Sequence, residues 1–226
     1  ARAEVFAARA IGLACAQALD MASATGDEGW AARAAFLTPI AKAYGTDTGC
    51  RVADTGVQVH GGMGFIEETG AAQYLRDVRI TPIYEGTNGI QAIDLVLRKM
   101  MDGGEMAFAL IDEVLAGANA AQDALPDLAA PLREAAQALR AATESLLASS
   151  QPDRLAGATP YLAAFARVLG AHFHLIAAQK GAGARAALAR IYVTRILPRN
   201  AGDLAEASAG IDQLAAIPDD AFGLGA

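Results

Sequence analysis

Apolar residues recur every three or four positions along most of this chain, which is the spacing of one face of an α-helix. A first helix is predicted over residues 1–24, with apolar positions running from Val5 to Met21. A second, longer helix is predicted over about 30–60. Pro39 is expected to bend its early part, because proline lacks the N–H that an internal helical position donates.

The pattern becomes less regular after residue 60. The sequence starting at Gly61, Gly-Gly-Met-Gly, predicts a helix C-terminal cap followed by a tight turn, since glycine adopts positive φ without strain. A short helix is expected over 71–79 and a non-helical crossing over 80–87, where Pro82 fixes the backbone. The period of three to four then returns in a helix over about 90–100.

A boundary is expected at Asp102-Gly-Gly, after which the predicted helices consist mainly of alanine and leucine. The helices predicted beyond it cover about 105–122, 128–149, a stretch starting at 151, 183–197 and 202–216. Antiparallel helices joined by short turns are the natural packing for such a series. We therefore predict an all-α fold with two parts, residues 1–101 and residues 102–226.

Composition agrees with this prediction and excludes several classes of protein. Of the 226 residues 56 are alanine and only 6% are aromatic, which disfavours an all-β fold because alanine is a strong helix former. No uninterrupted apolar run approaches about 18 residues, so no membrane span is expected. The net charge of −7 and the lack of a basic run make nucleic-acid binding improbable.

Two smaller observations concern redox state and processing. Cys15 and Cys50 lack metal-ligand spacing, so both are interpreted as buried thiols in a reducing compartment. The helical spacing of apolar residues begins at the first residues of the chain, which has no initiator methionine and no signal-peptide pattern at Ala1. This start suggests a fragment of a longer protein.

Glu85 is the main candidate for chemistry. It lies in the second of two stretches, residues 54–69 and 80–91, that are richer in glycine and polar residues than the rest. An apolar pocket around the carboxylate would make it a general base, although a first-turn glutamate stabilised by the helix dipole is the alternative. The glycines after Glu85 expose N–H groups that suit a phosphate or an oxyanion, while Thr87 adds a hydroxyl or caps the helix.

The histidines and one glycine-rich string are weaker candidates. His60 fits a helix C-terminal cap better than a catalytic role, and Gln58 alone is an ordinary surface amide. His172 and His174 face away from each other on one helix, so no metal site is expected. The string from Gly181, Gly-Ala-Gly-Ala-Arg-Ala, matches a loose dinucleotide fingerprint but has no strand before it, and we interpret it as a chance match.

Taken together, three motifs resemble a known family. Gln58-Val-His-Gly-Gly-Met-Gly-Phe, Leu75-Arg-Asp and Ile83-Tyr-Glu-Gly-Thr-Asn-Gly-Ile-Gln match, in order and spacing, the C-terminal helical domain of the acyl-CoA dehydrogenases over about residues 1–100. The resemblance implies an up-and-down four-helix bundle, with FAD held between domains and across a subunit interface. It also implies oxidation of an acyl-CoA to the trans-2-enoyl-CoA, with Glu85 removing the α-proton and the β-hydrogen leaving as hydride to flavin N5.

The same resemblance implies roles for neighbouring residues. Tyr84 and Gly86 would contact the acyl-CoA, and the backbone N–H of Glu85 would donate to its thioester carbonyl. The FAD contacts that it implies are Gln58, Gly61, Gly62, Thr87 and Asn88. Gly89 departs from the family pattern, because many members have a glutamine there, so a side-chain contact to the cofactor at this position is in doubt.

The second half of the chain, about 101–226, resembles the extra helical region of a larger bacterial subset of the family. That subset includes dehydrogenases acting on 3-methylmercaptopropionyl-CoA. We interpret this half as a packing and oligomerisation element, because it contains no catalytic constellation. The partners implied by the family are an acyl-CoA, electron-transfer flavoprotein and further copies of the chain in a dimer or tetramer, and the implied location is cytoplasmic.

Two other functions stay open at this point. One is a non-catalytic helical assembly module, and the other is an acyl-CoA oxidase on the same fold that passes electrons to oxygen. The 226-residue chain by itself is expected to be inactive and to bind FAD weakly or not at all.

Overall fold

The computed structural model describes residues 1–181, 183–218, 221 and 223, and these residues form helices, turns and loops without a strand. The all-α prediction is therefore confirmed. The helices are α1 (Arg2–Thr25), α2 (Glu28–His60), α3 (Gly62–Phe65), α4 (Ala71–Val78), α5 (Asn88–Leu97), α6 (Glu105–Ala120), α7 (Pro126–Ala148), α8 (Gln151–Ala156), α9 (Ala158–Lys180), α10 (Ala184–Arg195), α11 (Asn200–Ala207) and α12 (Asp212–Ala215), with 3₁₀ turns η1 (Glu67–Thr69) and η2 (Leu197–Arg199).

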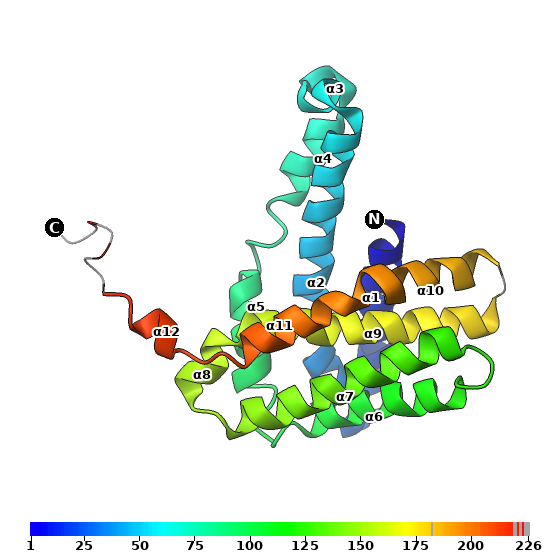
Figure 1. The fold of residues 1–226 in the computed structure, drawn as a ribbon, viewed down its shortest axis with the longest axis vertical. Coiled ribbons are helices and arrows are strands. Elements are labelled where there is room, and N and C mark those ends of the chain that lie inside the picture. Colours follow the sequence, from blue (N-terminus) through cyan, green and yellow to red (C-terminus); the bar gives the residue numbers. More distant parts are fainter. Residues whose placement is uncertain (182, 219–220, 222, 224–226) are drawn as a thin grey trace.

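Helix α2 is the longest element, with 33 residues. It begins where the Asp27 side chain accepts a hydrogen bond from the Gly29 N–H at 2.7 Å, and it continues unbroken past Pro39. Its C-terminal half extends away from the rest of the molecule, with α3 at the tip and α4 returning beside it (Figure 1). The hairpin of α2 and α4 therefore carries the 54–69 segment to the far end of the molecule.

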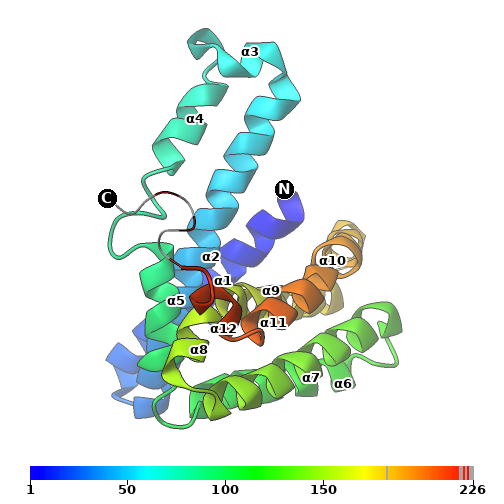
Figure 2. The same ribbon diagram turned by 60° about the vertical axis from the view of Figure 1, so that its left-hand side comes forward.

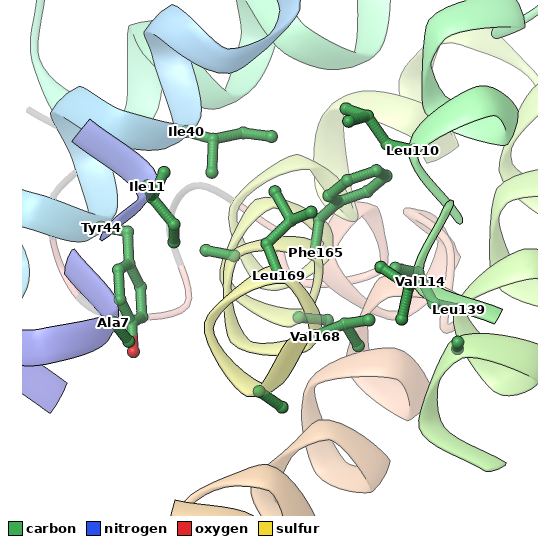
Figure 3. Close-up of a cluster of buried hydrophobic side chains, with 14 of the residues drawn as sticks. Ala7, Ile11, Ile40, Tyr44, Leu110, Val114, Leu139, Phe165, Val168 and Leu169 are labelled. Carbon is green, nitrogen blue, oxygen red and sulfur yellow. The ribbon is translucent and has the colours of Figure 1, made fainter. Parts of the chain in front are cut away.

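Helix α9 lies at the centre of the core. Figure 3 shows Phe165 and Leu169 of α9 between Ile40 of α2 on one side and Leu110 and Val114 of α6 on the other. These five side chains are at most 2% exposed and belong to one continuous apolar cluster. Since α9 packs on α1, α2 and α5 as well as on α6, α7, α10 and α11, it joins the two halves of the chain.

The composition change at Asp102 therefore does not divide the hydrophobic core. Asp102 shapes the turn between α5 and α6, where its carboxylate accepts hydrogen bonds from the N–H groups of Gly104 and Glu105. Figure 2 shows α6 and α7 lying against the body formed by the other helices. The division into separate domains at 101 and 102 stays a prediction.

Two predicted helices are broken at a glycine. The stretch starting at 151 divides into α8 and α9 at Gly157, where an added Cβ would collide with the backbone of Ala207 in α11. The helix predicted over 202–216 divides into α11 and α12, with Gly210 at φ 71° between them. Periodicity alone gave no sign of either break, because apolar residues continue on both sides.

Two predictions about individual residues are wrong. Val5, the first apolar position of the face predicted for the first helix, is 36% exposed, because α1 buries Ala3 and Ala7 near its start instead. Ile11, further along the predicted face, is buried as the spacing predicts. Cys50 is half-buried rather than buried, whereas Cys15 is buried as predicted and both thiols are free.

Two helices, α1 and α9, are long and apolar enough to cross a membrane when length and hydropathy alone are considered. This finding differs from the expectation based on uninterrupted apolar runs. Most of the apolar window of α9 is buried inside the protein, as in the core helix of a water-soluble protein, whereas only 22% of the α1 window is buried. The expected lack of a membrane span stays a prediction.

Candidate functional site

The connection between α4 and α5 carries Glu85 and is non-helical, as predicted. The backbone turns at Ile80, whose carbonyl accepts hydrogen bonds from the N–H groups of Ile83 and Tyr84 at 3.0 and 3.2 Å. The connection closes where the Asn88 N–H donates to the Pro82 carbonyl at 3.1 Å. These hydrogen bonds fix the path of the chain immediately before and after Glu85.

Glu85 itself adopts a left-handed backbone conformation. Its φ is 55°, and within the described part of the chain it is the one residue other than glycine with positive φ. Gly86 follows with φ 82°, and the Gln91 side-chain amide donates to the Glu85 carbonyl at 3.0 Å. Because such a conformation costs a glutamate on the order of 1 kcal/mol, surrounding contacts must hold it in place.

Thr87 caps the helix that follows. Its hydroxyl oxygen accepts a hydrogen bond from the Ile90 N–H at 3.4 Å, so the capping interpretation of Thr87 is confirmed. In the described residues, the backbone N–H groups of Glu85, Gly86 and Gly89 have no hydrogen-bond acceptor. The start of α5 therefore presents free donors of the kind that bind a phosphate or an oxyanion.

Asn88 fastens this connection to α2. Its side-chain amide donates to Asp47 Oδ1 at 2.7 Å, to Thr46 Oγ1 at 2.9 Å and to the Ala43 carbonyl at 3.3 Å. Its side-chain oxygen accepts from Lys42 Nζ at 2.8 Å. Since both polar atoms of the side chain, the amide nitrogen and the oxygen, contact residues of α2, Asn88 is a structural anchor of the connection.

Lys42 makes a second contact that links α2 to the residue after Glu85. Its ammonium group donates to the Gly86 carbonyl at 2.8 Å, across 44 positions of sequence. Neither Lys42 nor Gln91 was identified from the sequence, and no signal there could have found Lys42. A lysine within a helix is ordinarily a solvated charge, and nothing local indicates a partner so distant in the chain.

Glu85 lines a groove of about 400 Å³. The groove is lined by Thr38, Pro39, Glu85, Gly86, Ile90, Gln91, Asp94, Arg98 and Lys99. Glu85 is exposed, as is its neighbour Tyr84. The predicted apolar pocket around Glu85 is therefore not formed by the described residues of this chain, because charged groups of α5 line one side of the groove.

The second candidate segment lies at the end of α2. Gly61 takes φ 60° and its N–H donates to the Gln58 carbonyl at 3.1 Å, which confirms the predicted cap. His60 Nδ1 lies 2.8 Å from the Gly56 carbonyl, as expected for a histidine at a helix C-terminus. Gln58, Gly61 and Gly62 are exposed to solvent.

The two candidate segments do not meet within one chain. Thr46, which contacts Asn88, precedes Gln58 on the same helix by a separation of about 18 Å at 1.5 Å per residue. One compact ligand cannot touch both segments of the same copy. Only an elongated ligand, or two copies of the chain, could bring them to one site.

A larger apolar groove lies between α2, α4 and the start of α1. It measures about 470 Å³ and is lined by Val5, Gly49, Val52, Ala53, Gly56, His60, Thr69, Ala71, Tyr74 and Val78. It contains neither Glu85 nor Thr87. We therefore do not assign it to the chemistry of the Glu85 segment.

The other histidines have structural contacts. His174 Nε2 lies 3.0 Å from the Ala3 carbonyl, and burial lowers the pKa of His174. His172 is buried with Nε2 at 3.7 Å from Glu113. The residues described contain no group of three potential metal ligands. The glycine-rich string at 181 lies between α9 and α10, and its second residue, Ala182, is outside the described residues.

Two protein-family models match successive parts of the chain. Residues 1–101 match "Acyl-CoA dehydrogenase, C-terminal domain", and residues 107–218 match "Acetyl-CoA dehydrogenase C-terminal like". The boundary between the two matches lies close to the predicted division at 101.

Individual relatives agree with these family matches. The 3-methylmercaptopropionyl-CoA dehydrogenase of Ruegeria pomeroyi is 44% identical over 175 residues, which cover 71% of this chain and 29% of that protein. The mitochondrial very long-chain specific acyl-CoA dehydrogenase of Rattus norvegicus is 36% identical over 104 residues, 46% of this chain and 15% of that protein. The chain thus spans less than a third of the length of these relatives.

A solved structure has the same fold. Caenorhabditis elegans ACDH-11, crystallised in complex with C11-CoA, superposes with a TM-score of 0.74 at 19% identity, over 85% of this chain and 34% of that one. At that identity the likeness concerns the fold alone.

Proposed function

Because this chain belongs to the acyl-CoA dehydrogenase family, whose C-terminal domains it matches, we propose that it supplies the catalytic base of an FAD-dependent acyl-CoA dehydrogenase. The proposed reaction removes a proton from Cα and a hydride from Cβ of an acyl-CoA, leaving the trans-2-enoyl-CoA. Glu85 is the proposed base. The chain covers a small share of its relatives, so the activity is proposed for the whole protein.

The observation that carries the proposal is an exposed glutamate, Glu85, on a backbone held by hydrogen bonds. A weakly acidic α-proton is removed efficiently only by a base held in position. The Glu85 carbonyl accepts a hydrogen bond from the Gln91 amide, and the next carbonyl, of Gly86, accepts one from Lys42. Glu85 lines an open groove, which an acyl chain could enter. Closure of that groove by substrate and by other parts of the enzyme would supply the desolvation that this chain does not provide.

The free N–H groups beside Glu85 suit the rest of the substrate. Removal of the α-proton leaves negative charge on the thioester oxygen, and a donor aimed at that oxygen stabilises it. The N–H of Glu85 is the proposed donor, since it has no other acceptor in the described residues. Tyr84 and Gly86, which flank it, are the proposed contacts of the acyl-CoA.

The residues present also fit an FAD contact. FAD, when bound, would accept the β-hydrogen as hydride. The N-terminus of α5, with Thr87 and Asn88, offers backbone donors for a pyrophosphate, while Gln58, Gly61 and Gly62 offer an exposed amide and uncrowded backbone. Asn88 would act by holding the N-terminus of α5 in place, since its own side-chain amide already donates hydrogen bonds to α2.

The separation of these two groups along α2 supports a site shared by two copies of the chain. We therefore propose a homo-oligomer in which the Gln58 segment of one copy completes the site of another. Electron-transfer flavoprotein is the proposed electron acceptor and the cytoplasm the proposed location. A short-chain CoA thioester such as 3-methylmercaptopropionyl-CoA is the proposed substrate class, on the basis of the relative from Ruegeria pomeroyi.

The experiment uses the full-length protein and its Glu85→Gln variant. Both are mixed anaerobically with 3-methylmercaptopropionyl-CoA, butyryl-CoA and undecanoyl-CoA while flavin absorbance is followed. We expect rapid bleaching in the wild type and none in Glu85→Gln, with FAD retained in both. Glu206→Gln, an exposed glutamate on α11, is the matched control and should bleach like the wild type.

Three results would overturn the proposal. Bleaching at the wild-type rate in Glu85→Gln would exclude Glu85 as the base. A full-length protein that is colourless and cannot be reconstituted with FAD would favour a helical assembly module. Peroxide formation in air at the rate of substrate oxidation would favour an acyl-CoA oxidase.

A further inference from the structure

The left-handed backbone at Glu85 needs an external support. Glu85 and Gly86 have consecutive positive φ values of 55° and 82°. A glutamate does not adopt this conformation by preference, whereas Gly86 adopts it without strain. The direction of the Glu85 side chain therefore depends on the contacts that hold these two peptide units.

Lys42 makes the contact nearest to Glu85 that comes from another element. Its ammonium group lies 2.8 Å from the Gly86 carbonyl and 2.8 Å from Asn88 Oδ1, so it joins α2 to both ends of a three-residue stretch. The Gln91 amide, which holds the Glu85 carbonyl, comes from α5 itself and moves with the loop. Among the described residues of α2, Lys42 is thus the side chain that holds the Gly86–Thr87 peptide, the second peptide unit after Glu85.

The fold of α2 does not depend on Lys42. The buried face of α2 in this region consists of Phe36, Leu37, Ile40, Ala43 and Tyr44, whereas Lys42 is only partly buried. Asn88 keeps its hydrogen bonds to Ala43, Thr46 and Asp47 when the lysine is removed. Loss of Lys42 should therefore release the Gly86 peptide while the start of α5 remains docked.

From these contacts we propose that Lys42 is a positioning residue for catalysis, which aims the Glu85 carboxylate by holding the Gly86 carbonyl. The proposal rests on the proposed function of Glu85. In this role the lysine acts through the Gly86 carbonyl and takes no proton. Its effect is confined to the geometry of the base, where a displacement of about 1 Å can slow a reaction on the order of 100-fold.

The test compares Lys42→Met and Lys42→Arg in the full-length holoenzyme, with Lys180→Met on α9 as the matched control for loss of one lysine. The acyl-CoA is whichever of the three named above reduces the wild-type flavin fastest. We expect Lys42→Met to lower the limiting rate of flavin reduction by roughly 10- to 100-fold, with FAD content and the KM for acyl-CoA within about twofold of wild type. Lys42→Arg, which keeps a charged donor, should be faster than Lys42→Met.

A limiting rate for Lys42→Met within about twofold of wild type would overturn the proposal. So would loss of FAD or a lower melting temperature in Lys42→Met, or an equal rate in the Met and Arg variants, because the lysine would then support the fold rather than aim the base. These outcomes differ from failure of the proposed function. Failure of the proposed function would show as flavin bleaching in Glu85→Gln or as a wild-type protein that cannot bind FAD. Neither result depends on the Lys42 variants.

Discussion

The hydroxyl groups of Tyr44 and Tyr192 lie 2.9 Å apart in the core, where they join α2 to α10. Tyr192 also donates to the Arg167 carbonyl of α9 at 3.3 Å. In this arrangement Tyr44 donates to Tyr192 and Tyr192 donates onward to the carbonyl, so both buried hydroxyls are satisfied. The pair ties together the two parts of the chain that match separate family models.

Removing one hydroxyl of this pair should cost more than removing the other. Tyr192→Phe leaves the Tyr44 hydroxyl without a partner among the described residues and should lower the free energy of unfolding by about 2 kcal/mol. Tyr44→Phe leaves Tyr192 its carbonyl acceptor and should cost about 1 kcal/mol. Urea denaturation of both single variants and the double variant measures these losses. Strictly additive losses would contradict coupling between the hydroxyls.

Alkaline pH should destabilise the protein. Burial raises the pKa of Tyr44, Tyr161 and Tyr192 above the usual value of 10.0. Above about pH 10 the unfolded chain therefore loses tyrosine protons that the folded protein keeps, so the free energy of unfolding falls as pH rises. Denaturation between pH 8 and 11 measures this slope. Tyr161→Phe should flatten it, whereas Tyr74→Phe, at a side chain 76% exposed, should not.

Acid pH should weaken the link between α2 and α6. The neighbouring His172 ring and the two hydrogen bonds from Arg33 hold the pKa of Glu113 at about 2, below its usual 4.5. The folded carboxylate is thus stabilised in its charged form. That stability is complete above pH 4.5 and is lost as pH falls toward 2. Because Glu113 is well exposed, we expect Glu113→Gln to cost no more than about 1 kcal/mol at neutral pH.

The check for Glu113 is the difference in unfolding free energy between wild type and Glu113→Gln. This difference should shrink between about pH 4.5 and pH 2. A difference that is constant over that range would mean that the lowered pKa of Glu113 makes no contribution to stability.

Two helical glycines should respond in opposite ways to alanine. Gly170 in α9 faces the Tyr192 ring and lies where an added Cβ would come within 2.8 Å of the Ala7 Cβ, so Gly170→Ala should destabilise by about 1–3 kcal/mol. Gly202 in α11 has open space around it, and Gly202→Ala should stabilise by about 0.5–1 kcal/mol. Thermal melting of both variants tests the pair. Stabilisation by Gly170→Ala would show that the helices can separate at this crossing.

The helices of this fold were largely predictable, because most of them show the three-to-four spacing of apolar residues. The start of α5 was predictable as well, since Thr87 precedes an apolar helix and is a common capping residue. The breaks at Gly157 and Gly210 were not, because each depends on contacts with a distant segment. Gly157 lies against Ala207, and the Ile211 N–H donates to Asp153 at 2.9 Å.

The candidate site was predictable in its residues but not in its geometry. Glu85 and Thr87 stood out as polar residues in an apolar, glycine-flanked stretch. The left-handed backbone of Glu85 and its support from Lys42 depend on packing between segments more than 40 residues apart. The apolar pocket considered for Glu85 is not formed by the described residues of this chain, and local composition says nothing about which other segments cover a side chain.

The central position of α9 also determines when this protein can fold during synthesis. The side chains of α1 and α2 that pack on α9 leave the ribosome before α9 does. About 80 further residues must be synthesised after α5 before α9 is complete. At about 5–20 residues per second, those apolar faces wait several seconds for their partner. During that interval they are exposed to aggregation or to chaperones, so the nascent chain is most vulnerable between completion of α5 and emergence of α9.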